Sequence, residues 1–323
     1  MSMLRQIELA ARTRPPSERV PWRRARWFYL FILPWALGFL VFTLGPVLSG
    51  LSMSFTSFDG MNFNSVRFVG GRNYLDAFRD AQAWHGFKRA LYLAAIGIPL
   101  GMIASFGAAV LLTREIHGRS LFRTLFYIPS LVPVTAVVWI WKLLMDNNFG
   151  LVNATLAAIV PGAHVRWMTV YPTQVLLLMG LWQSTGQGTV IYMAGLQSVP
   201  RELEDAARID GAGSVQRFRY VTIPLVTPVI FYQLITSVIG VGQVLVQPIL
   251  LASGLGSAGA GLGTIPPRDN YFFMVHVWNR VFTNLQFGYG FALLWLLFAF
   301  VLVLTLIVFS TARYWVYYEV EQH

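Results

Sequence analysis

Long apolar segments separated by shorter polar stretches dominate this sequence. A helix needs about 20 predominantly apolar residues to cross the hydrocarbon core of a bilayer. Six segments come close to that length: Phe28 to Leu48, Ala90 to Leu112, Leu125 to Leu144, Val175 to Leu196, Val221 to Leu251 and Phe287 to Phe309. None of them contains Asp or Glu, and Lys142 is near enough to the end of its segment to reach the membrane surface. The pattern predicts an all-α integral membrane protein with six transmembrane helices.

The amino-acid composition supports a membrane-embedded chain. Of the 323 residues, 56% are hydrophobic and 12% are charged, and the mean hydropathy is +0.57. Soluble globular domains carry about twice that share of charged residues. Because the chain has no cysteine, disulfides, cysteine-ligated zinc and thiol catalysis are all excluded.

The distribution of positive charge indicates the orientation in the membrane. A net charge of +10 would also suit a nucleic-acid-binding protein. However, the arginines gather before the first apolar segment and in the polar stretches on that same side, a bias that favours cytoplasmic N- and C-termini. We therefore expect residues 1–27 to form a basic cytoplasmic segment, residues 28–311 a transmembrane domain and residues 312–323 a cytoplasmic tail. Membrane lipid, and not nucleic acid, is the expected partner of these charges.

The polar stretch between the fourth and fifth apolar segments has the local chemistry of two helices joined by a turn. Ser198 and Ser214 are candidate N-caps, and Gly211 and Gly213 can form a sharp turn between the helices. Residues 198–221 are therefore predicted to form a cytoplasmic helix-turn-helix. The residues alone leave two roles open: docking into a groove of a partner protein, or lying on the lipid headgroups.

Several segments resemble the signatures of one family. The sequence EDAARIDGAG, followed by VTIPLVTP, resembles the coupling-helix motif, or EAA loop, of binding-protein-dependent ABC importer permeases. Further resemblance to the sugar and glycerol-phosphate permeases lies in FVGGRNYLDAF, GRSLFRTLFYIPSLVPV, FGLVN, VIYMAGLQSVPRELEDAARIDGA and FGYGFAL. The opening LPWALGFLVFTLGPVLSGLSMSFTSFDG is similar to the larger maltose permease subunit. Together these segments cover most of the chain from about Phe28 onward.

The resemblance implies the fold of a type I ABC importer permease, with the helix-turn-helix as its coupling loop. In that family the first helix of the loop sits in a cleft of the ATPase, so that ATP-driven closure moves the membrane helices. The coupling residues carried over are Glu204, Asp205, Ala206, Ala207, Asp210 and Gly211. The family usually has Glu where this chain has Asp205, and the shorter carboxylate changes the contact geometry. None of these residues would perform chemistry.

The resemblance also implies an assembly. Its other members would be a second permease subunit, forming a heterodimer with this one, two ABC ATPase subunits and an extracytoplasmic solute-binding protein. ATP and Mg²⁺ would be bound by the ATPase subunits, and this chain would hold no cofactor or metal. The expected location is the plasma (inner) membrane of a bacterium or archaeon, which the chain would cross several times.

The fourth apolar segment has a polar centre that lipid would not tolerate, so that this centre must face other helices or a cavity. The fifth segment repeats the feature with Gln233, Gln243 and Gln247. The candidate pathway residues are Trp182, Gln183, Ser184, Gln187, Gln243 and Gln247, and Gln183, Gln187 and Gln243 resemble positions that line the sugar site of the maltose permease. Amides and hydroxyls beside aromatic rings suit a neutral sugar. The alternative is that these groups only hold the helices together.

Other functions fit the sequence less well. A P-loop needs a lysine after glycine, whereas Lys88 and Lys142 follow Phe87 and Trp141. A secondary carrier would usually place a carboxylate or histidine within a span, and a passive channel would not need a docking loop.

An intramembrane enzyme would need clustered titratable groups. The five histidines are instead scattered over loops and the tail, where we expect them to be solvated or to cap helices: His85, His117, His164, His276 and His323. The sequence therefore predicts a non-enzymatic transmembrane subunit of an ABC importer for a sugar or a related polyhydroxylated solute.

Overall fold

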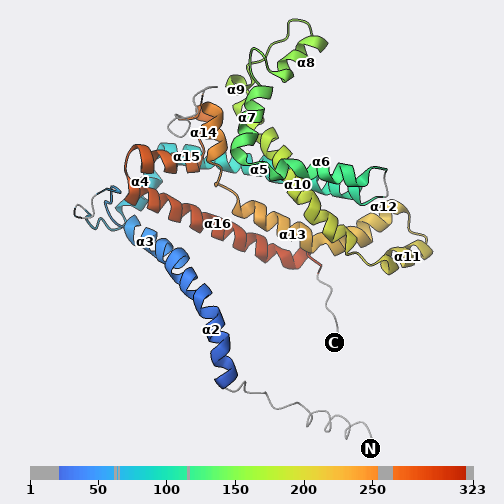
Figure 1. Cartoon of the computed structure of the whole chain (residues 1–323), viewed down its shortest axis with the longest axis horizontal. Coiled ribbons are helices and arrows are strands. Elements are labelled where there is room, and N and C mark those ends of the chain that lie inside the picture. The colour runs from blue at the N-terminus through green and yellow to red at the C-terminus, as the bar shows by residue number, and fades with distance from the viewer. Residues whose placement is uncertain (1–21, 62–63, 65, 115–116, 254–264, 318–323) are drawn as a thin grey trace, which may run out of the picture. The chain divides into compact units, whose positions relative to one another are not determined.

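The computed structural model describes residues 22–61, 64, 66–114, 117–253 and 265–317 (Figure 1). All regular structure in these residues is helical, apart from a single β-bridge between Thr56 and Phe68. The chain forms two compact units that divide between Ser52 and Met53. Most of the basic N-terminal segment and half of the C-terminal tail expected in the cytoplasm lie outside the described residues.

The first unit consists of one long helical segment. It runs through α2 (Trp22–Phe39), the π-helical turn η1 (Leu40–Leu44) and most of α3 (Gly45–Ser54), whose last two residues belong to the second unit. The 29-residue candidate span Arg26–Ser54 covers this helical segment. Large apolar side chains such as Phe31, Trp35 and Phe42 are exposed along it. Because a single helix cannot cover these side chains by itself, they require lipid or other protein segments as their surroundings.

The second unit is built around two long helices that pack along each other, α5 (Ala81–Thr113) and α10 (Pro172–Gln197). Helix α13 (Ile223–Ile239) packs against both of them, and α16 (Phe287–Trp315) packs against α13 (Figure 1). Small residues allow the close approach of α5 and α10, since a Cβ atom added to Gly188 would lie only 2.6 Å from Ser105 Oγ. Shorter helices complete the unit: α4 (Arg72–Arg79), α8 (Leu151–Ile159), α9 (Trp167–Val170), η5 (Arg268–Asn270), α15 (Phe273–Trp278) and η6 (Asn279–Thr283).

The third apolar segment, predicted as one transmembrane helix, is not one continuous helix. It is divided into α6 (Arg119–Leu131) and α7 (Val134–Leu144), which are bent by 103° relative to each other. Val132 and Pro133 between them have extended backbone conformations, with ψ of 129° and 140°. A proline disfavours helical geometry in the residue before it, and here this preference breaks the segment at Val132.

The fifth apolar segment is also interrupted. The helix continues through α12 (Ser214–Arg217), the π-helical turn η3 (Phe218–Thr222) and α13, so that Ser214–Ile239 forms a candidate span of 26 residues. It ends in a turn at residues 240–245, where Gly242 has a positive φ of 81°. The predicted continuation to Leu251 is therefore wrong, and α14 (Val246–Ala252) is a separate helix.

Lys142 is not extended toward the surroundings of the chain, as a lysine that reaches out of its apolar segment would be. Its side chain on α7 is buried, and its ammonium group donates hydrogen bonds to the carbonyl oxygen and, at 3.0 Å, to the hydroxyl of Ser253. Ser253 follows α14 directly. The buried lysine therefore joins α7 to the end of α14, which offsets part of the cost of removing its charge from water.

The described residues confirm an all-α chain with several membrane-spanning helices, but not the number six. Four helices are long and apolar enough to cross a membrane, namely Arg26–Ser54, Ala81–Thr113, Ser214–Ile239 and Phe287–Trp315. The bent pair α6 and α7 would add a fifth. At 26 residues α10 is also long enough, but its polar centre lowers its hydropathy and it is not among them.

Candidate functional site

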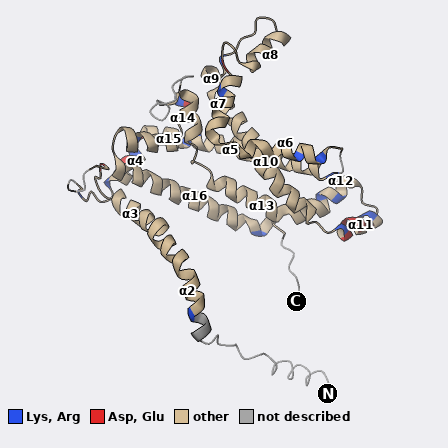
Figure 2. Ribbon diagram, in the orientation of Figure 1, with Lys and Arg blue, Asp and Glu red and all other residues tan. Residues whose placement is uncertain are grey.

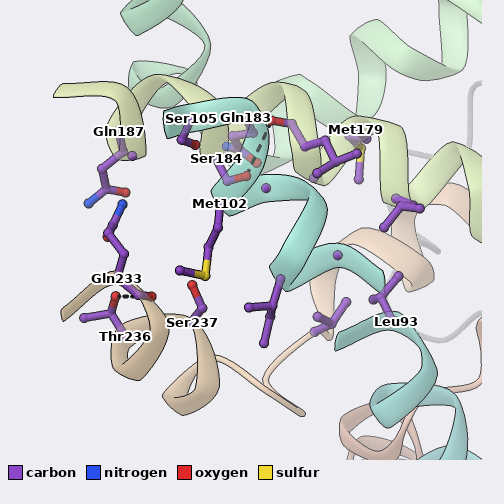
Figure 3. A pocket seen from close by; sticks show the side chains of 18 of the residues that line it. Leu93, Met102, Ser105, Met179, Gln183, Ser184, Gln187, Gln233, Thr236 and Ser237 are labelled. Carbon is purple, nitrogen blue, oxygen red and sulfur yellow. Dashed lines mark hydrogen bonds between the residues drawn. The ribbon is translucent and has the colours of Figure 1, made fainter. Parts of the chain in front are cut away.

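A cavity of about 420 Å³ lies between α5, α10, α13 and the beginning of α14. Its walls combine small and apolar residues from α5 with amides and hydroxyls from α10 and α13 (Figure 3). The polar residues that line it are Ser105, Gln183, Ser184, Gln187, Tyr232, Gln233, Thr236, Ser237 and Gln247. Every residue in the lining is uncharged.

Two amides dominate one side of this cavity. Gln187 on α10 and Gln233 on α13 point toward one another (Figure 3), and among the described residues neither side-chain amide has a hydrogen-bond partner. Gln183, in contrast, donates to the carbonyl oxygen of Val132 at 3.2 Å, at the bend between α6 and α7. Gln183 therefore supports the wall of the cavity, while Gln187 and Gln233 offer free donors and acceptors to a bound solute.

The structure brings together four of the six pathway residues predicted from the sequence. Gln183, Ser184, Gln187 and Gln247 line the cavity, whereas Trp182 and Gln243 do not. Trp182 stacks edge-on against Trp141 with ring centroids 6.4 Å apart. The amide of Gln243 donates to the carbonyl oxygen of Ile239 at 2.8 Å, within the turn that ends α13.

The contribution of α13 to the lining was not predicted from the sequence, apart from the polar character of Gln233. Tyr232, Gln233, Thr236 and Ser237 all lie on this helix and all line the cavity. Their spacing of one, four and five residues places them on one face of a helix. This polar face within an apolar segment was the signal that could have revealed them.

The polar stretch after α10 folds as the predicted helix, turn and helix. Helix α11 (Arg201–Ile209) ends at a turn in which Gly211 has a positive φ of 84°, as glycine at a helix C-terminus commonly does. The predicted caps are wrong, because Pro200 and Gly213 occupy the N-cap positions of α11 and α12. Ser198 instead donates its hydroxyl hydrogen to the carbonyl oxygen of Gly195 at the end of α10.

The predicted coupling residues lie on α11 and on the turn that follows it. Asp205 and Ala206 are exposed, and the Asp205 carboxylate lies 3.8 Å from the guanidinium of Arg208. The Glu204 side chain faces the other way and accepts a hydrogen bond from Thr222 at 3.4 Å. At the end of the helix, Ile209 is 87% exposed. The exposed face of α11 therefore carries both charged and apolar side chains.

The remaining members of the predicted set cap the end of α11. Ala207 is half-buried, and its carbonyl oxygen accepts from the backbone N–H of Ala212 at 2.9 Å. Asp210 and Gly211 are exposed, and their N–H groups donate to the carbonyl oxygens of Ala206 and Arg208. These bonds satisfy the carbonyl groups left at the end of the helix. The short helix is therefore a well-formed unit that projects its exposed face.

A partly buried ionic cluster lies at the start of α5. One carboxylate oxygen of Asp80 caps this helix by accepting hydrogen bonds from two backbone N–H groups. The other oxygen accepts a hydrogen bond from the Arg280 guanidinium at 2.8 Å and from the Tyr289 hydroxyl at 3.0 Å. It also lies 3.2 Å from His276 Nε2. The expectation that His276 is solvated or caps a helix is wrong, because its side chain is completely buried. Its other ring nitrogen lies 3.0 Å from the hydroxyl of Tyr271.

The charges in this cluster follow from burial and pairing. Burial lowers the pKa of His276 to about 4, with a smaller contribution in the same direction from Arg280, and the attraction of Asp80 only partly opposes it. Burial on its own would raise the pKa of Asp80, but the backbone N–H of Ala83 and the Tyr289 hydroxyl help to hold it below its usual range. At neutral pH, His276 is therefore neutral and Asp80 is ionised and paired with Arg280.

We expect the folded chain to lose stability as the pH falls from 6.5 to about 4. In this range the unfolded chain binds a proton at His276 and the folded chain does not, so the free energy of unfolding decreases as the pH is lowered. At 1.36 kcal/mol per pH unit, the loss by pH 4.5 is roughly 2 kcal/mol. It can be measured as a lower melting temperature in detergent.

The His276→Gln variant is expected to lose most of this pH dependence between 6.5 and 4.5. The His164→Gln variant is the matched control, because His164 is exposed, and it should retain the dependence. An unchanged pH profile in His276→Gln would contradict the assignment of the effect to the buried imidazole. Below pH 4 a further loss is expected in every variant, because protonation of Asp80 then removes the carboxylate that pairs with Arg280.

No group of three or more His, Cys, Asp or Glu side chains among the described residues is placed to hold a metal ion. The geometry of the second unit is thus an uncharged cavity between membrane helices, an exposed helix-turn-helix and a partly buried ionic cluster.

Comparison with known proteins places this geometry in a family. The profile of the family described as "Binding-protein-dependent transport system inner membrane component" matches residues 97–322. The chain is 32% identical over 299 residues to a probable ABC transporter permease protein, YesP, of Bacillus subtilis, with 91% of this chain and 93% of that protein covered. It is 29% identical to the trehalose/maltose transport system permease protein MalF of Thermococcus litoralis, with 92% and 97% covered.

A solved structure shows the same fold. It is the crystal structure of a bacterial ABC transporter involved in the import of the acidic polysaccharide alginate. One of its chains superimposes on this chain with a TM-score of 0.76 at 19% sequence identity. The superposition covers 90% of this chain and 96% of that chain. The match to the family profile extends over more than two-thirds of the sequence and includes the cavity helices and the helix-turn-helix. The chain therefore belongs to the family of inner membrane components of binding-protein-dependent transport systems, whose members are permease subunits and not enzymes.

Proposed function

We propose that this chain is one of two permease subunits of an ABC importer, and that its cavity is the part of the translocation pathway through which a neutral, polyhydroxylated solute such as a sugar passes. The observation that carries the proposal is the lining of the cavity. Free amides on Gln187 and Gln233, together with hydroxyls on Ser184 and Ser237, can exchange hydrogen bonds with the hydroxyl groups of a sugar. The absence of charge from the lining favours a neutral solute over an anionic one.

The names of related proteins support a sugar-like solute. Relatives are described as permeases for trehalose and maltose, for lactose (28% identical, Rhizobium radiobacter) and for sn-glycerol-3-phosphate (29% identical, Yersinia pestis). Glycerol phosphate and alginate are anionic, and an anion usually requires a basic group in its site. Among these solutes, the uncharged cavity fits the neutral sugars best.

The partners follow from the exposed surfaces. A second permease subunit would cover the side of α10 on which Ser184 and Gln187 are exposed and close the pathway as a heterodimer. Two ABC ATPase subunits, which would bind ATP and Mg²⁺, would receive α11 through Asp205, Ala206 and the turn at Gly211. An extracytoplasmic binding protein would deliver the solute. In support, a bacterial alginate ABC transporter with the same fold has been crystallised in complex with an alginate pentasaccharide-bound periplasmic protein.

The orientation follows from the same proposal. The ATPase subunits are cytoplasmic, so α11 and the termini would lie on the cytoplasmic side, and the ionic cluster at Asp80, at the opposite end of α5, would lie on the outer side. The arginine-rich composition of the segments near α11 agrees with this orientation. The chain itself would bind no cofactor.

We expect the substitutions Gln187→Leu and Gln233→Leu each to reduce solute uptake about fivefold, because each removes a hydrogen-bonding partner of the solute worth roughly 1 kcal/mol. Uptake is measured in proteoliposomes that contain the complete complex, with radiolabelled maltose, trehalose, lactose and glycerol phosphate as probes. The native complex identifies the best of these probes, which is then used for the variants.

The Gln243→Leu variant is the matched control, because it makes the same change outside the cavity lining. It should transport at nearly the native rate. Equal losses in Gln243→Leu and Gln187→Leu would contradict the assignment of the pathway to this cavity. Faster uptake of glycerol phosphate than of every neutral sugar would contradict the proposed solute class.

A further inference from the structure

A second, larger cavity has a strongly basic lining. It has a volume of about 930 Å³ and lies between the end of α5, α6, the end of α10, α11 and α12. Positively charged side chains gather on α6, α11 and α12 in this part of the chain (Figure 2). The lining contains one acidic residue, Glu204, and five arginines: Arg114, Arg119, Arg123, Arg201 and Arg217.

These arginines have no acidic partners in the described part of the chain. None of the five lies within 4.0 Å of a carboxylate oxygen there, and Glu204 interacts instead with the hydroxyl of Thr222. Arg119 and Arg217 each donate to a backbone carbonyl oxygen, of Leu112 at 2.6 Å and of Ala212 at 2.8 Å. Among the described residues, the charge of the cluster is therefore not compensated by a carboxylate.

Arg123 has the clearest unsatisfied group of this cluster. It is one helical turn beyond Arg119 on α6, and its Nε atom is buried without a hydrogen-bond partner. In the amide orientation that satisfies both groups, Gln197 accepts hydrogen bonds from the two guanidinium groups, each at 3.1 Å. Two like charges are thus held together by one neutral amide, an arrangement that an anion would stabilise.

The shape and position of the cavity define the kind of anion. Guanidinium groups match the oxygens of a phosphate with paired hydrogen bonds. The remaining walls mix polar groups, such as Gln197 and Thr222, with apolar side chains that include Val110, Leu196 and Phe218. The apolar part suits a ligand with a hydrocarbon portion. The cavity also includes Thr113 and Ser214, the end and the beginning of two candidate spans, so that it lies at the depth where lipid headgroups meet water.

We propose that this basic cavity binds a phosphate-bearing anion, and that the phosphate belongs to the headgroup of an anionic phospholipid. Arg119 and Arg123 bind the phosphate oxygens, and the acyl chains extend along the apolar wall. A bound headgroup would connect α6 to the helix-turn-helix through their shared cavity. The inference does not depend on the proposed function, because it concerns the arginines and not the exposed face of α11.

The test uses the full-length chain in detergent and measures by native mass spectrometry how much added lipid it retains. The probes are phosphatidylglycerol, which is anionic, phosphatidylcholine, which is zwitterionic, and inorganic phosphate. We expect the native chain to prefer phosphatidylglycerol over phosphatidylcholine at least about fivefold, the effect of one basic residue near an anionic headgroup. Inorganic phosphate at the same concentration should not displace it.

The primary variant is Arg123→Gln, because Arg119 also supports the end of α5 through Leu112. It should lower phosphatidylglycerol retention about fivefold, and Arg119→Gln/Arg123→Gln should lower it further. The control Arg67→Gln/Arg166→Gln removes the same charge from exposed arginines outside the cavity and should leave retention unchanged. The melting temperature of each variant shows that it is folded.

Three results would show that the cavity does not hold a lipid headgroup. Displacement of phosphatidylglycerol by inorganic phosphate would support a phosphate site but assign it to the soluble anion. Equal retention of phosphatidylglycerol by the native chain and Arg123→Gln would overturn the proposal. A variant that keeps its lipid but no longer associates with the ATPase subunits would also overturn it, since the arginines would then contact protein.

Discussion

The Asp205→Arg variant is expected to lose the stimulation of ATP hydrolysis by solute and binding protein, leaving only the basal rate of the assembled complex. Asp205 is 67% exposed on α11 and, among the described residues, pairs only with Arg208 one turn away, so its carboxylate is free to meet a basic residue of the ATPase. Reversal of this charge would place two cations against each other in the proposed contact, and such a repulsion costs several kcal/mol. ATP turnover is measured in proteoliposomes with the native and variant complexes.

Two further variants make this result specific. Asp76→Arg makes the same change at an exposed aspartate on α4, which also pairs with an arginine of its own helix, Arg72 at 3.7 Å, and it should not affect stimulation. Asp205→Glu restores the residue usual in the family and should remain coupled. The melting temperature of Asp205→Arg should be close to native, because a surface ion pair such as that with Arg208 contributes little to stability.

Full stimulation in Asp205→Arg would show that α11 does not transmit the ATPase motion through this residue. The orientation of the loop can be checked in the same preparation. The chain has no cysteine, so Ala206→Cys introduces a single thiol on the exposed face of α11. Reaction of this thiol with a membrane-impermeant maleimide from the outer side would contradict the cytoplasmic location on which the prediction depends.

Local chemistry allowed the sequence to predict the helix-turn-helix but not the breaks in the membrane segments. The former depends on nearby residues: acidic side chains early in α11, and glycine at the turn where φ is positive. Proline is ambiguous in the apolar segments, because Pro99 and Pro129 lie inside intact helices while Pro133 accompanies the 103° bend. Whether a proline breaks a helix depends on the packing of neighbouring helices, which hydropathy does not contain.

Packing between distant residues also decides which of the predicted site residues line the cavity. The polar centre of α10 was visible because amides in an apolar segment must avoid lipid, and Gln183, Ser184 and Gln187 do line the cavity. Gln243 was assigned to a continuous helix, but the turn after Ile239 places it outside the lining. The burial of His276 and the gathering of five arginines around one cavity depend on contacts between residues far apart in sequence.

The Gly186→Ala variant is expected to lower the melting temperature of the chain in detergent by a few degrees. A Cβ atom at this position on α10 would lie 2.3 Å from the carbonyl oxygen of Phe126 and 3.2 Å from the Cα atom of Tyr127, both backbone atoms of α6. Backbone atoms cannot rotate away as a side chain can, so α6 and α10 would have to separate. Overpacking of this kind costs about 1 to 3 kcal/mol.

The same helix provides the matched control. A Cβ atom added to Gly180 meets nothing within 4 Å, so Gly180→Ala should melt at or above the native temperature, because alanine favours a helix by about 1 kcal/mol over glycine. Separation of α6 from α10 would also disturb the hydrogen bond from Gln183 to Val132, and with it the wall of the cavity. Gly186→Ala should therefore reduce solute uptake as well as stability. A native melting temperature for Gly186→Ala would show that α6 does not pack closely against α10, and the cavity could not then have the wall described.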